Sequence, residues 1–342
     1  MKESITIQHF GPITKAEVVI KDINIFIGTT SSGKSTVAKL ISIFQNLAFR
    51  TNISYRDFNK LLADYNIDFA ITPDTMIHYK KDHLNIELKG KNITFRISPG
   101  KSAPVLTPIY IPAERVFFST ISQSIFGLMS SNISLPKWII DFGARFEQAR
   151  NSLKKLPIDF LKADYEYDDS TDYIQLRNSI KIKLSQASSG LQSVIPLLLV
   201  IGFNTEKKHE EKNFFVIEEP ELNLYPSSQK DLVEFIIGKI NSSGDKLIIT
   251  THSPYLLTAI DNLIQAKNVM AEHPGVKDKV ARLVPEKYWL EYDKVSCYYF
   301  DDGSGRSTMD KENRSIGPSN IDNVSERLSE TFEELLTLKY PG

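Results

Sequence analysis

The sequence predicts an α/β fold with a parallel core sheet, an N-terminal antiparallel β subdomain and an inserted helical lobe. Three observations support this prediction. Short apolar runs recur along the chain and helical patterns follow several of them, which is typical of a parallel sheet. Alternating segments separated by turn residues occur before residue 100, which is typical of antiparallel strands. Helical spacing dominates from about 116 to 163, which predicts the lobe.

The elements follow in chain order from these patterns. We expect antiparallel strands at 4–7, 16–20, 75–81, 84–88 and 93–97. We expect parallel-sheet strands at 213–217 and 246–250, further strands at 23–27, 104–111 and 295–300, and helices from Lys34 and at 227–240, 254–270 and 321–338. The acidic, Tyr-rich stretch 164–172 is expected to be a loop and the polar stretch 272–279 a linker. The predicted core domain therefore spans 1–270, followed by a strand-and-helix extension at 271–342.

Composition excludes several classes of protein. The 342 residues include 41 Lys+Arg and 42 Asp+Glu, so the net charge of −1 does not indicate nucleic-acid binding, although local basic patches leave it possible. The one cysteine, Cys297, excludes an intrachain disulfide framework and a multi-cysteine zinc site. The longest apolar run, 194–203, is half of the roughly 20 residues that a membrane helix needs, and residues 1–4 start no secretion signal. We therefore expect a cytoplasmic protein without a membrane partner.

A phosphate-binding loop follows the predicted strand 23–27. The segment fits G-x-x-x-x-G-K-[ST] and reads Gly28-Thr29-Thr30-Ser31-Ser32-Gly33-Lys34-Ser35. Glycines let such a loop turn its N–H groups toward phosphate oxygens, and the next helix presents its positive end. We expect Lys34 to reach the β- and γ-phosphates and Ser35 to ligate Mg²⁺. The nucleotide-binding residues expected here are Gly28, Ser31, Ser32, Gly33, Lys34, Ser35 and Thr36.

Polar residues follow two later apolar strands. Glu218 and Glu219 end the run 213–217, where charge is costly unless a ligand compensates it. We assign Glu218 to the Mg²⁺ shell and Glu219 to polarising the attacking water. His252, after the strand 246–250, can donate a hydrogen bond to the γ-phosphate or to the water. A solvated loop for the glutamates and a helix-capping role for His252 are the simpler alternatives.

A second potential anion site lies between these elements. Ser188, Ser189 and Gly190 form a turn that leads into a predicted helix, whose N-terminus favours anions. Because the chain already has one phosphate loop, the simplest explanation is that this helix end contacts ATP held by another subunit. A plain N-cap by Ser188 or Ser189 is the alternative.

The order of these motifs resembles that of the ABC-type ATPase heads of the SMC and RecF group. It is more closely similar to the OLD-like bacterial ATPases, AAA-type proteins found in phage-defence operons. The resembling stretches are 9–13, 28–35, 110–115, 188–192, 217–226 and 250–255. The resemblance implies an ABC-type P-loop ATPase head that binds ATP and Mg²⁺, hydrolyses ATP and forms a homodimer or a higher homo-oligomer.

The resemblance also implies roles for individual residues. Glu219 takes the place of the catalytic glutamate, His252 that of the switch histidine, and Glu218 the place usually held by an aspartate. Ser189 and Gly190 match the signature pair that contacts the γ-phosphate across a dimer. The segment 221–224 falls where the D-loop lies.

Two positions depart from the family's pattern. Leu191 stands where a second glycine is common, which predicts weaker contacts to the partner's nucleotide. Gln45 lies inside a predicted helix and is a poor candidate for the Q-loop. The segment 112–115 fits that neighbourhood better, although Glu114 and Arg115 can equally form an internal ion pair.

The leading functional hypothesis is an ATPase subunit that controls a separately encoded effector, a nuclease or toxin, in bacterial anti-phage defence. The Septu, PARIS and retron-associated ATPases are similar in kind. No TOPRIM-like acidic cluster follows residue 270, and Asp301-Asp302 is expected to be a solvated turn. The alternatives are a RecF-like DNA repair ATPase and an ATP-bound scaffold without turnover. The clearest basic clusters for DNA are 154–155 and 207–209.

Overall fold

The computed structural model describes residues 3–46, 53–82, 84–97, 106–121, 135–177, 180–206, 212–317 and 322–340. The strands of its largest sheet are β1 (Glu3–Phe10), β2 (Ile13–Ile20), β3 (Ile23–Gly28), β4 (Ile71–Lys81), β5 (Leu84–Lys89), β6 (Asn92–Ile97), β7 (Leu106–Ile111), β12 (Lys212–Glu218), β13 (Lys246–Thr251), β14 (Val295–Asp301) and β15 (Ser304–Ser307). The longer helices are α1 (Lys34–Phe44), α2 (Tyr55–Asp64), α5 (Lys137–Leu153), α6 (Ser189–Glu206), α7 (Pro226–Ser243), α8 (Pro254–Glu272) and α10 (Asp322–Lys339).

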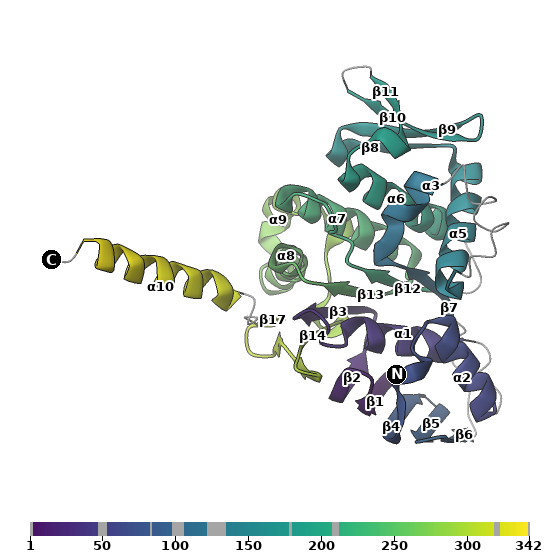
Figure 1. The fold of residues 1–342 in the computed structure, drawn as a ribbon. Coiled ribbons are helices and arrows are strands. Elements are labelled where there is room, and N and C mark those ends of the chain that lie inside the picture. The colour runs from purple at the N-terminus through teal and green to yellow at the C-terminus, as the bar shows by residue number, and fades with distance from the viewer. Residues whose placement is uncertain are drawn as a thin grey trace.

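The largest sheet has two halves that differ in strand direction. Its order is β6-β5-β4-β1-β2-β15-β14-β3-β13-β12-β7 (Figure 1). The half from β6 to β2 is antiparallel, whereas β14, β3, β13, β12 and β7 are parallel to their neighbours in the other half. This arrangement confirms the predicted α/β fold with a parallel core and an antiparallel β subdomain.

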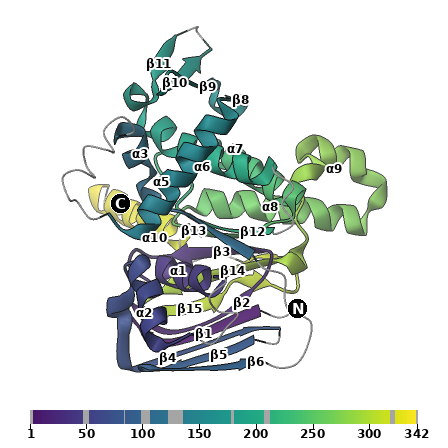
Figure 2. The same cartoon turned by 90° about the vertical axis from the view of Figure 1, so that its right-hand side faces the viewer.

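Burial explains why the two halves have different sequence patterns. Strand β2 alternates between buried and exposed residues, because one of its faces is open. Strands β3 and β12 are buried almost throughout, because both faces of the parallel half are covered. Helix α1 packs on β3, β7, β12 and β13. Among the other helices, α5 packs on α6, α6 on α7, and α7 on α8. Figure 2 shows α5, α6, α7 and α8 above the strands β12 and β13, whereas α1 and the antiparallel strands lie below them.

The lobe contains strands as well as helices. Helices α3 (Val116–Ile121) and α5 belong to it. A small antiparallel sheet follows α5 and consists of β8 (Lys155–Ile158), β9 (Ala163–Asp168), β10 (Thr171–Leu176) and β11 (Lys181–Lys183). The prediction of a loop at 164–172 is therefore wrong. Tyr165 points into the core and the carboxylate of Asp172 is buried with it, so the acidic stretch forms a hairpin despite its polarity.

The C-terminal part also differs from the expectation in one respect. The prediction of a linker at 272–279 is wrong, because a short 3-10 turn (Pro274–Val276) and helix α9 (Lys277–Leu283) follow α8 directly. Strand β14 lies beside β3 in the core sheet, and α10 projects from the body of the molecule (Figure 1). The domain boundary at residue 270 stays a prediction. Within the described part of the chain, no helix has the length and apolar character required to cross a bilayer.

Candidate functional site

The phosphate-binding loop connects β3 to α1 and needs its two glycines for steric reasons. Gly28 has φ +148°, and a Cβ there would lie 1.9 Å from the carbonyl oxygen of Phe300 in β14. Gly33 has φ +97°, and a Cβ there would lie 2.1 Å from Cδ1 of Ile13, the first residue of β2. Only glycine tolerates both the conformation and the crowding. The loop is thus held between the C-terminal strand and the N-terminal hairpin.

Lys34 begins α1 and lies under the loop with 5% of its surface exposed. Its Nζ donates hydrogen bonds to the carbonyl oxygens of Gly28 at 3.0 Å and Thr29 at 2.7 Å. Burial lowers the pKa of Lys34 to about 8, although the negative charges of Glu219 and Glu221 oppose this change. The ammonium group is therefore poorly solvated where the motif predicts contact with phosphates.

The serine residues of the loop differ in their exposure to solvent. Ser32 is buried and donates to the carbonyl oxygen of Thr29 at 2.7 Å, while Ser31 is exposed with φ +60°. Ser35 and Thr36 are half-buried in the first turn of α1. No side chain caps this helix and no acidic residue lies in its first turn, so its N–H groups face the loop as donors.

Glu218 ends β12 with 6% of its surface exposed, and its Oε1 atom has no hydrogen-bond partner among the described residues. The hydroxyl of Tyr110 faces this carboxylate, and burial together with the negative charge raises the pKa of Tyr110 well above its usual value. A buried, uncompensated carboxylate oxygen fits a hard cation such as Mg²⁺. In the described part of the chain no group of three His, Cys, Asp or Glu could hold a metal by itself, so phosphate oxygens would have to complete the shell.

Glu219 and His252 are brought together at the ends of β12 and β13. Glu219 has φ +42°, and its N–H donates to the carbonyl oxygen of Thr250 at 2.8 Å. Its Oε1 lies 3.6 Å from Nε2 of His252. Burial, followed by the positive charge of Lys34, lowers the pKa of His252, whereas Glu219 opposes the change. The imidazole is therefore neutral at pH 7 and can both donate and accept a hydrogen bond.

Glu221 is a residue of this site whose role the sequence pattern did not reveal. Its Oε1 accepts hydrogen bonds from the hydroxyl of Thr251 at 2.5 Å and from the N–H of His252 at 3.0 Å. Its Oε2 has no partner among the described residues, and burial raises its pKa. This carboxylate therefore connects the segment 221–224 to the residues Thr251 and His252 at the end of β13.

Arg115 follows β7 in a short 3-10 turn (Ala113–Arg115) and is fully buried. Its guanidinium group donates to the carbonyl oxygens of Pro112, Glu218, Glu219 and Ser193 and to the Ser193 hydroxyl, at 2.5, 2.6, 2.8, 3.2 and 3.4 Å. Burial lowers the pKa of Arg115 to about 10, against the charges of the nearby glutamates. The structure therefore shows main-chain carbonyls as the partners of Arg115, in place of the ion pair with Glu114.

The Ser-Ser-Gly turn begins α6. The Ser188 hydroxyl accepts from the N–H of Leu191 at 3.5 Å, which is an N-cap contact, and Ser189 is exposed at the helix end. Gly190 is buried, and a Cβ there would lie 2.8 Å from the carbonyl oxygen of Asn223. The helix end thus packs on the segment 221–224. Its contact with the nucleotide of a second chain stays a prediction.

Gln45 lies apart from these residues. It ends α1 and its amide group hydrogen-bonds Glu3, Tyr79 and Lys81 in the antiparallel half. That Gln45 is a poor candidate for the Q-loop stays a prediction. Of the basic clusters, Lys155 pairs with Glu166 at 3.0 Å, and 207–209 lies outside the described residues.

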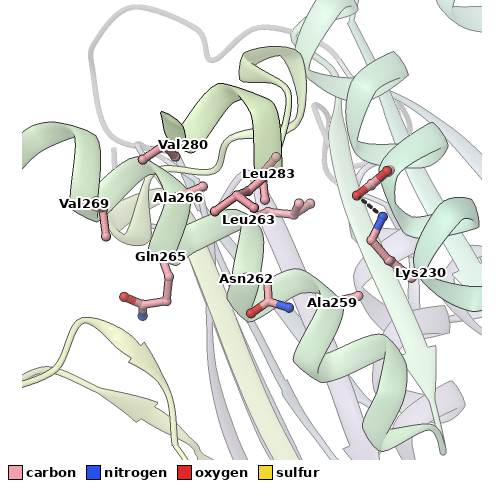
Figure 3. Close-up of a pocket in the computed structure, with 11 residues that line it drawn as sticks. Lys230, Ala259, Asn262, Leu263, Gln265, Ala266, Val269, Val280 and Leu283 are labelled. Atoms are coloured by element: carbon pink, nitrogen blue, oxygen red, sulfur yellow. Dashed lines mark hydrogen bonds and ion pairs between the residues drawn. The ribbon is translucent and has the colours of Figure 1, made fainter. Parts of the chain in front are cut away.

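One concave region of the described structure borders the site, and another lies away from it. A polar hollow of about 370 Å³ borders the phosphate loop and is lined by Ser31, Ser32 and the exposed turn Asp301-Asp302. Asp301 accepts a hydrogen bond from the Thr29 hydroxyl at 3.0 Å. A larger apolar groove of about 430 Å³ lies between α8 and α9, with Leu263 and Leu283 on its walls (Figure 3). None of the predicted site residues lines this groove.

Comparison with known proteins gives one family match. The AAA ATPase domain model matches residues 1–133 and 117–257. Among solved structures, the SMC head domain from Thermotoga maritima is 11% identical, over 90% of this chain and 97% of that chain, with a TM-score of 0.45. The recombination mediator protein RecF is 10% identical, over 90% and 98%, with a TM-score of 0.40. An ABC-transporter ATP-binding cassette in its ADP conformation is 13% identical, over 92% and 93%, with a TM-score of 0.39. The comparison with curated proteins gives no match.

Proposed function

This chain belongs to the AAA ATPase domain family, and from that premise we propose that it hydrolyses ATP in a site shared by two copies of the chain. One observation carries the proposal. Lys34, Glu219 and His252 come from three distant segments, and the structure brings them together at the end of the parallel strands. A lysine under a phosphate loop beside a carboxylate–imidazole pair suits the transfer of a phosphoryl group to water.

ATP would bind with its phosphates on the loop 28–33. The ammonium group of Lys34 would turn from the carbonyl oxygens of Gly28 and Thr29 toward the β- and γ-phosphates. Ser35 and Glu218 would hold Mg²⁺, which neutralises part of the phosphate charge when bound. The Oε1 atom of Glu218 supports this assignment, because it is buried without a partner among the described residues.

Glu219 would accept a proton from the attacking water, and the neutral His252 would donate a hydrogen bond to the γ-phosphate or to the water. Both side chains are about one-third exposed, so water can reach them. The exposed Ser189 and the α6 N-terminus would contact the γ-phosphate held by a second chain. ATP would then favour the paired state by its higher affinity for it, and hydrolysis would remove that preference.

We propose further that this cycle controls a separately encoded nuclease or toxin in anti-phage defence. The support is the resemblance of the motif order to the OLD-like ATPases. Direct action on DNA, as in a RecF-like ATPase, is the competing function. A binding constant for duplex DNA that falls steeply with salt would favour it, with a slope reflecting several released counterions.

The substitution Glu219→Gln tests the ATPase proposal. It removes the proton acceptor but keeps the side-chain shape, so we expect kcat to fall by roughly 10²–10⁴-fold while ATP binding is retained. Size-exclusion chromatography with light scattering should then show a stable ATP-bound dimer. Glu87→Gln, in the antiparallel half, is the matched control and should behave as wild type. An unchanged rate would refute the role of Glu219, and a monomer at saturating Mg-ATP would refute the shared site.

A further inference from the structure

The start of α6 and the turn after β12 form one connected block in this structure. Gly190 allows the α6 end to approach Asn223 so closely that a Cβ would lie 2.8 Å from its carbonyl oxygen. Within the same turn of α6, Ser193 offers its carbonyl oxygen and its hydroxyl to Arg115. The predicted contact to a second chain's nucleotide and the predicted catalytic glutamate are therefore mechanically linked within one chain.

Arg115 makes the more directional of these two links. One side of its guanidinium group, Nε with Nη2, faces Ser193, while Nη1 and Nη2 donate to the carbonyl oxygens of Glu218 and Glu219. The group is fully buried, so each of these bonds replaces lost hydration and is costly to break. The planar guanidinium group fixes the orientation of α6 relative to Glu218 and Glu219, whereas a side chain with one donor nitrogen would not fix it.

The geometry of Glu219 makes its position sensitive to this link. Its backbone has φ +42°, which costs a non-glycine residue free energy and persists only when neighbours hold it. The holding contacts are its N–H bond to the carbonyl oxygen of Thr250 and the bonds that its own carbonyl oxygen accepts from Arg115 and from the N–H of Leu222. A small shift of the arginine would therefore change where the Glu219 carboxylate points.

We propose that Arg115 is a positioning residue that couples the two functions of the chain. A γ-phosphate of the partner that binds at Ser189 moves the α6 end, and Arg115 transmits this movement to Glu219 of the same chain. Each chain then reaches full hydrolytic competence only when it has engaged its partner's nucleotide. The inference rests on the proposed function, because it assumes a site shared by two chains.

Arg115→Lys tests this coupling, because lysine keeps the charge but its single nitrogen cannot reach both Ser193 and the two glutamate carbonyls. Arg150→Lys is the matched control. Arg150 is a buried arginine of the lobe that pairs with Asp172, away from the loop. The measurements are the affinity of the monomer for ATP, kcat, and the dependence of the rate per chain on protein concentration.

We expect Arg115→Lys to bind ATP with wild-type affinity, to lower kcat at least tenfold and to lose the rise of the rate per chain with protein concentration. Arg150→Lys should lower thermal stability but keep the wild-type kcat and the wild-type rise of the rate per chain with protein concentration. An Arg115→Lys protein that is folded and retains the concentration dependence overturns the inference. If wild type itself shows ATP hydrolysis with no such dependence, the shared-site proposal fails instead.

Ser193→Ala serves if Arg115→Lys does not fold. It deletes only the hydroxyl that faces Nη2 at 3.4 Å, so the fold should persist. We expect the concentration dependence to weaken by about half, with ATP affinity unchanged. A concentration dependence equal to that of wild type in this variant would then overturn the coupling role of Arg115.

Discussion

The lobe and the candidate site each bury an arginine, but they compensate it differently. In the lobe, Arg150 pairs with the carboxylate of Asp172 at 3.0 Å, and the Tyr165 hydroxyl also donates to that carboxylate. At the site, Arg115 is bonded to main-chain carbonyls, while one oxygen each of Glu218 and Glu221 has no partner among the described residues. The carboxylates are close to a cation and yet do not bind it directly.

This difference shows what each region is built for. The lobe pairs its buried arginine with a buried carboxylate of the same chain, although Nε of Arg150 has no hydrogen-bond partner among the described residues. The site holds its glutamates by their backbone and leaves side-chain oxygens available to a ligand. A region built in this way carries a cost in free energy that a bound cation can offset. The following predictions test that contrast, in order of decreasing expected effect.

The largest effect is expected in the lobe. Asp172→Asn leaves the Arg150 charge buried without its counter-ion, which should lower the free energy of unfolding by about 3–5 kcal/mol. Urea denaturation monitored by tryptophan fluorescence would measure it. The affinity for ATP at a temperature where the variant is folded should not change. A loss below about 1 kcal/mol would mean that the pair is solvated.

A smaller effect of opposite sign is expected at the site. Glu218→Gln removes a buried charge whose Oε1 has no hydrogen-bond partner in the described part of the chain, so the ligand-free protein should gain about 1–2 kcal/mol of stability. The same variant should lose most of the additional stabilisation that Mg²⁺ gives over ATP alone in thermal denaturation. If Glu218→Gln destabilises the ligand-free protein as much as Asp172→Asn does, the contrast between the two regions is not real.

The smallest effect concerns pH. Burial lowers the pKa of Lys34 to about 8, and bound phosphates would favour its charged form again. ATP affinity should therefore be constant below pH 8 and weaken by up to about tenfold per pH unit above it, with proton uptake on binding. Titration calorimetry at pH 9 in buffers of different ionisation enthalpy measures that uptake. Lys34→Arg, which stays charged, should bind ATP without the pH slope, and a slope in this variant would assign the effect to another group.

The same shift has a consequence for the ligand-free fold. Because the pKa of Lys34 is lower in the folded chain than its usual value of 10.5, the unfolded chain binds more protons between these two values. The contribution of Lys34 to stability therefore rises as the pH increases from about 8 to 10.5. This direction is opposite to the loss of ATP affinity over the same range.

Much of the fold was predictable because its signals are local. Apolar runs marked β3, β12 and β13, and the spacing of apolar residues marked α1, α7 and α8. The phosphate loop was predictable because glycine, lysine and serine have fixed places in a short motif. The hairpin of β9 and β10 was missed because its acidic residues hide a buried face, in which Tyr165 and Asp172 compensate each other. Helix α9 was missed because Pro274 and Gly275 suggested a linker.

The network around Arg115 could not be predicted for a different reason. Apart from the Ser193 hydroxyl, its acceptors are the main-chain carbonyl oxygens of residues 112, 193, 218 and 219. Every amino acid has a main-chain carbonyl group, so the sequence does not indicate which of them accept these hydrogen bonds. The only available signal was an arginine directly after an apolar strand. The sequence left two interpretations of 112–115 open, a Q-loop neighbourhood and an ion pair of Glu114 with Arg115, because neither can reveal contacts to carbonyl groups that are distant in the sequence.

The close contact of Gly28 with Phe300 has a consequence for the order of events during synthesis. The phosphate loop leaves the ribosome well before β14, the strand against which it packs. At typical rates of translation the interval between the two is on the order of tens of seconds. During that time the loop lacks one of its two packing surfaces, so a nascent chain would complete its nucleotide-binding loop only after β14 has been synthesised.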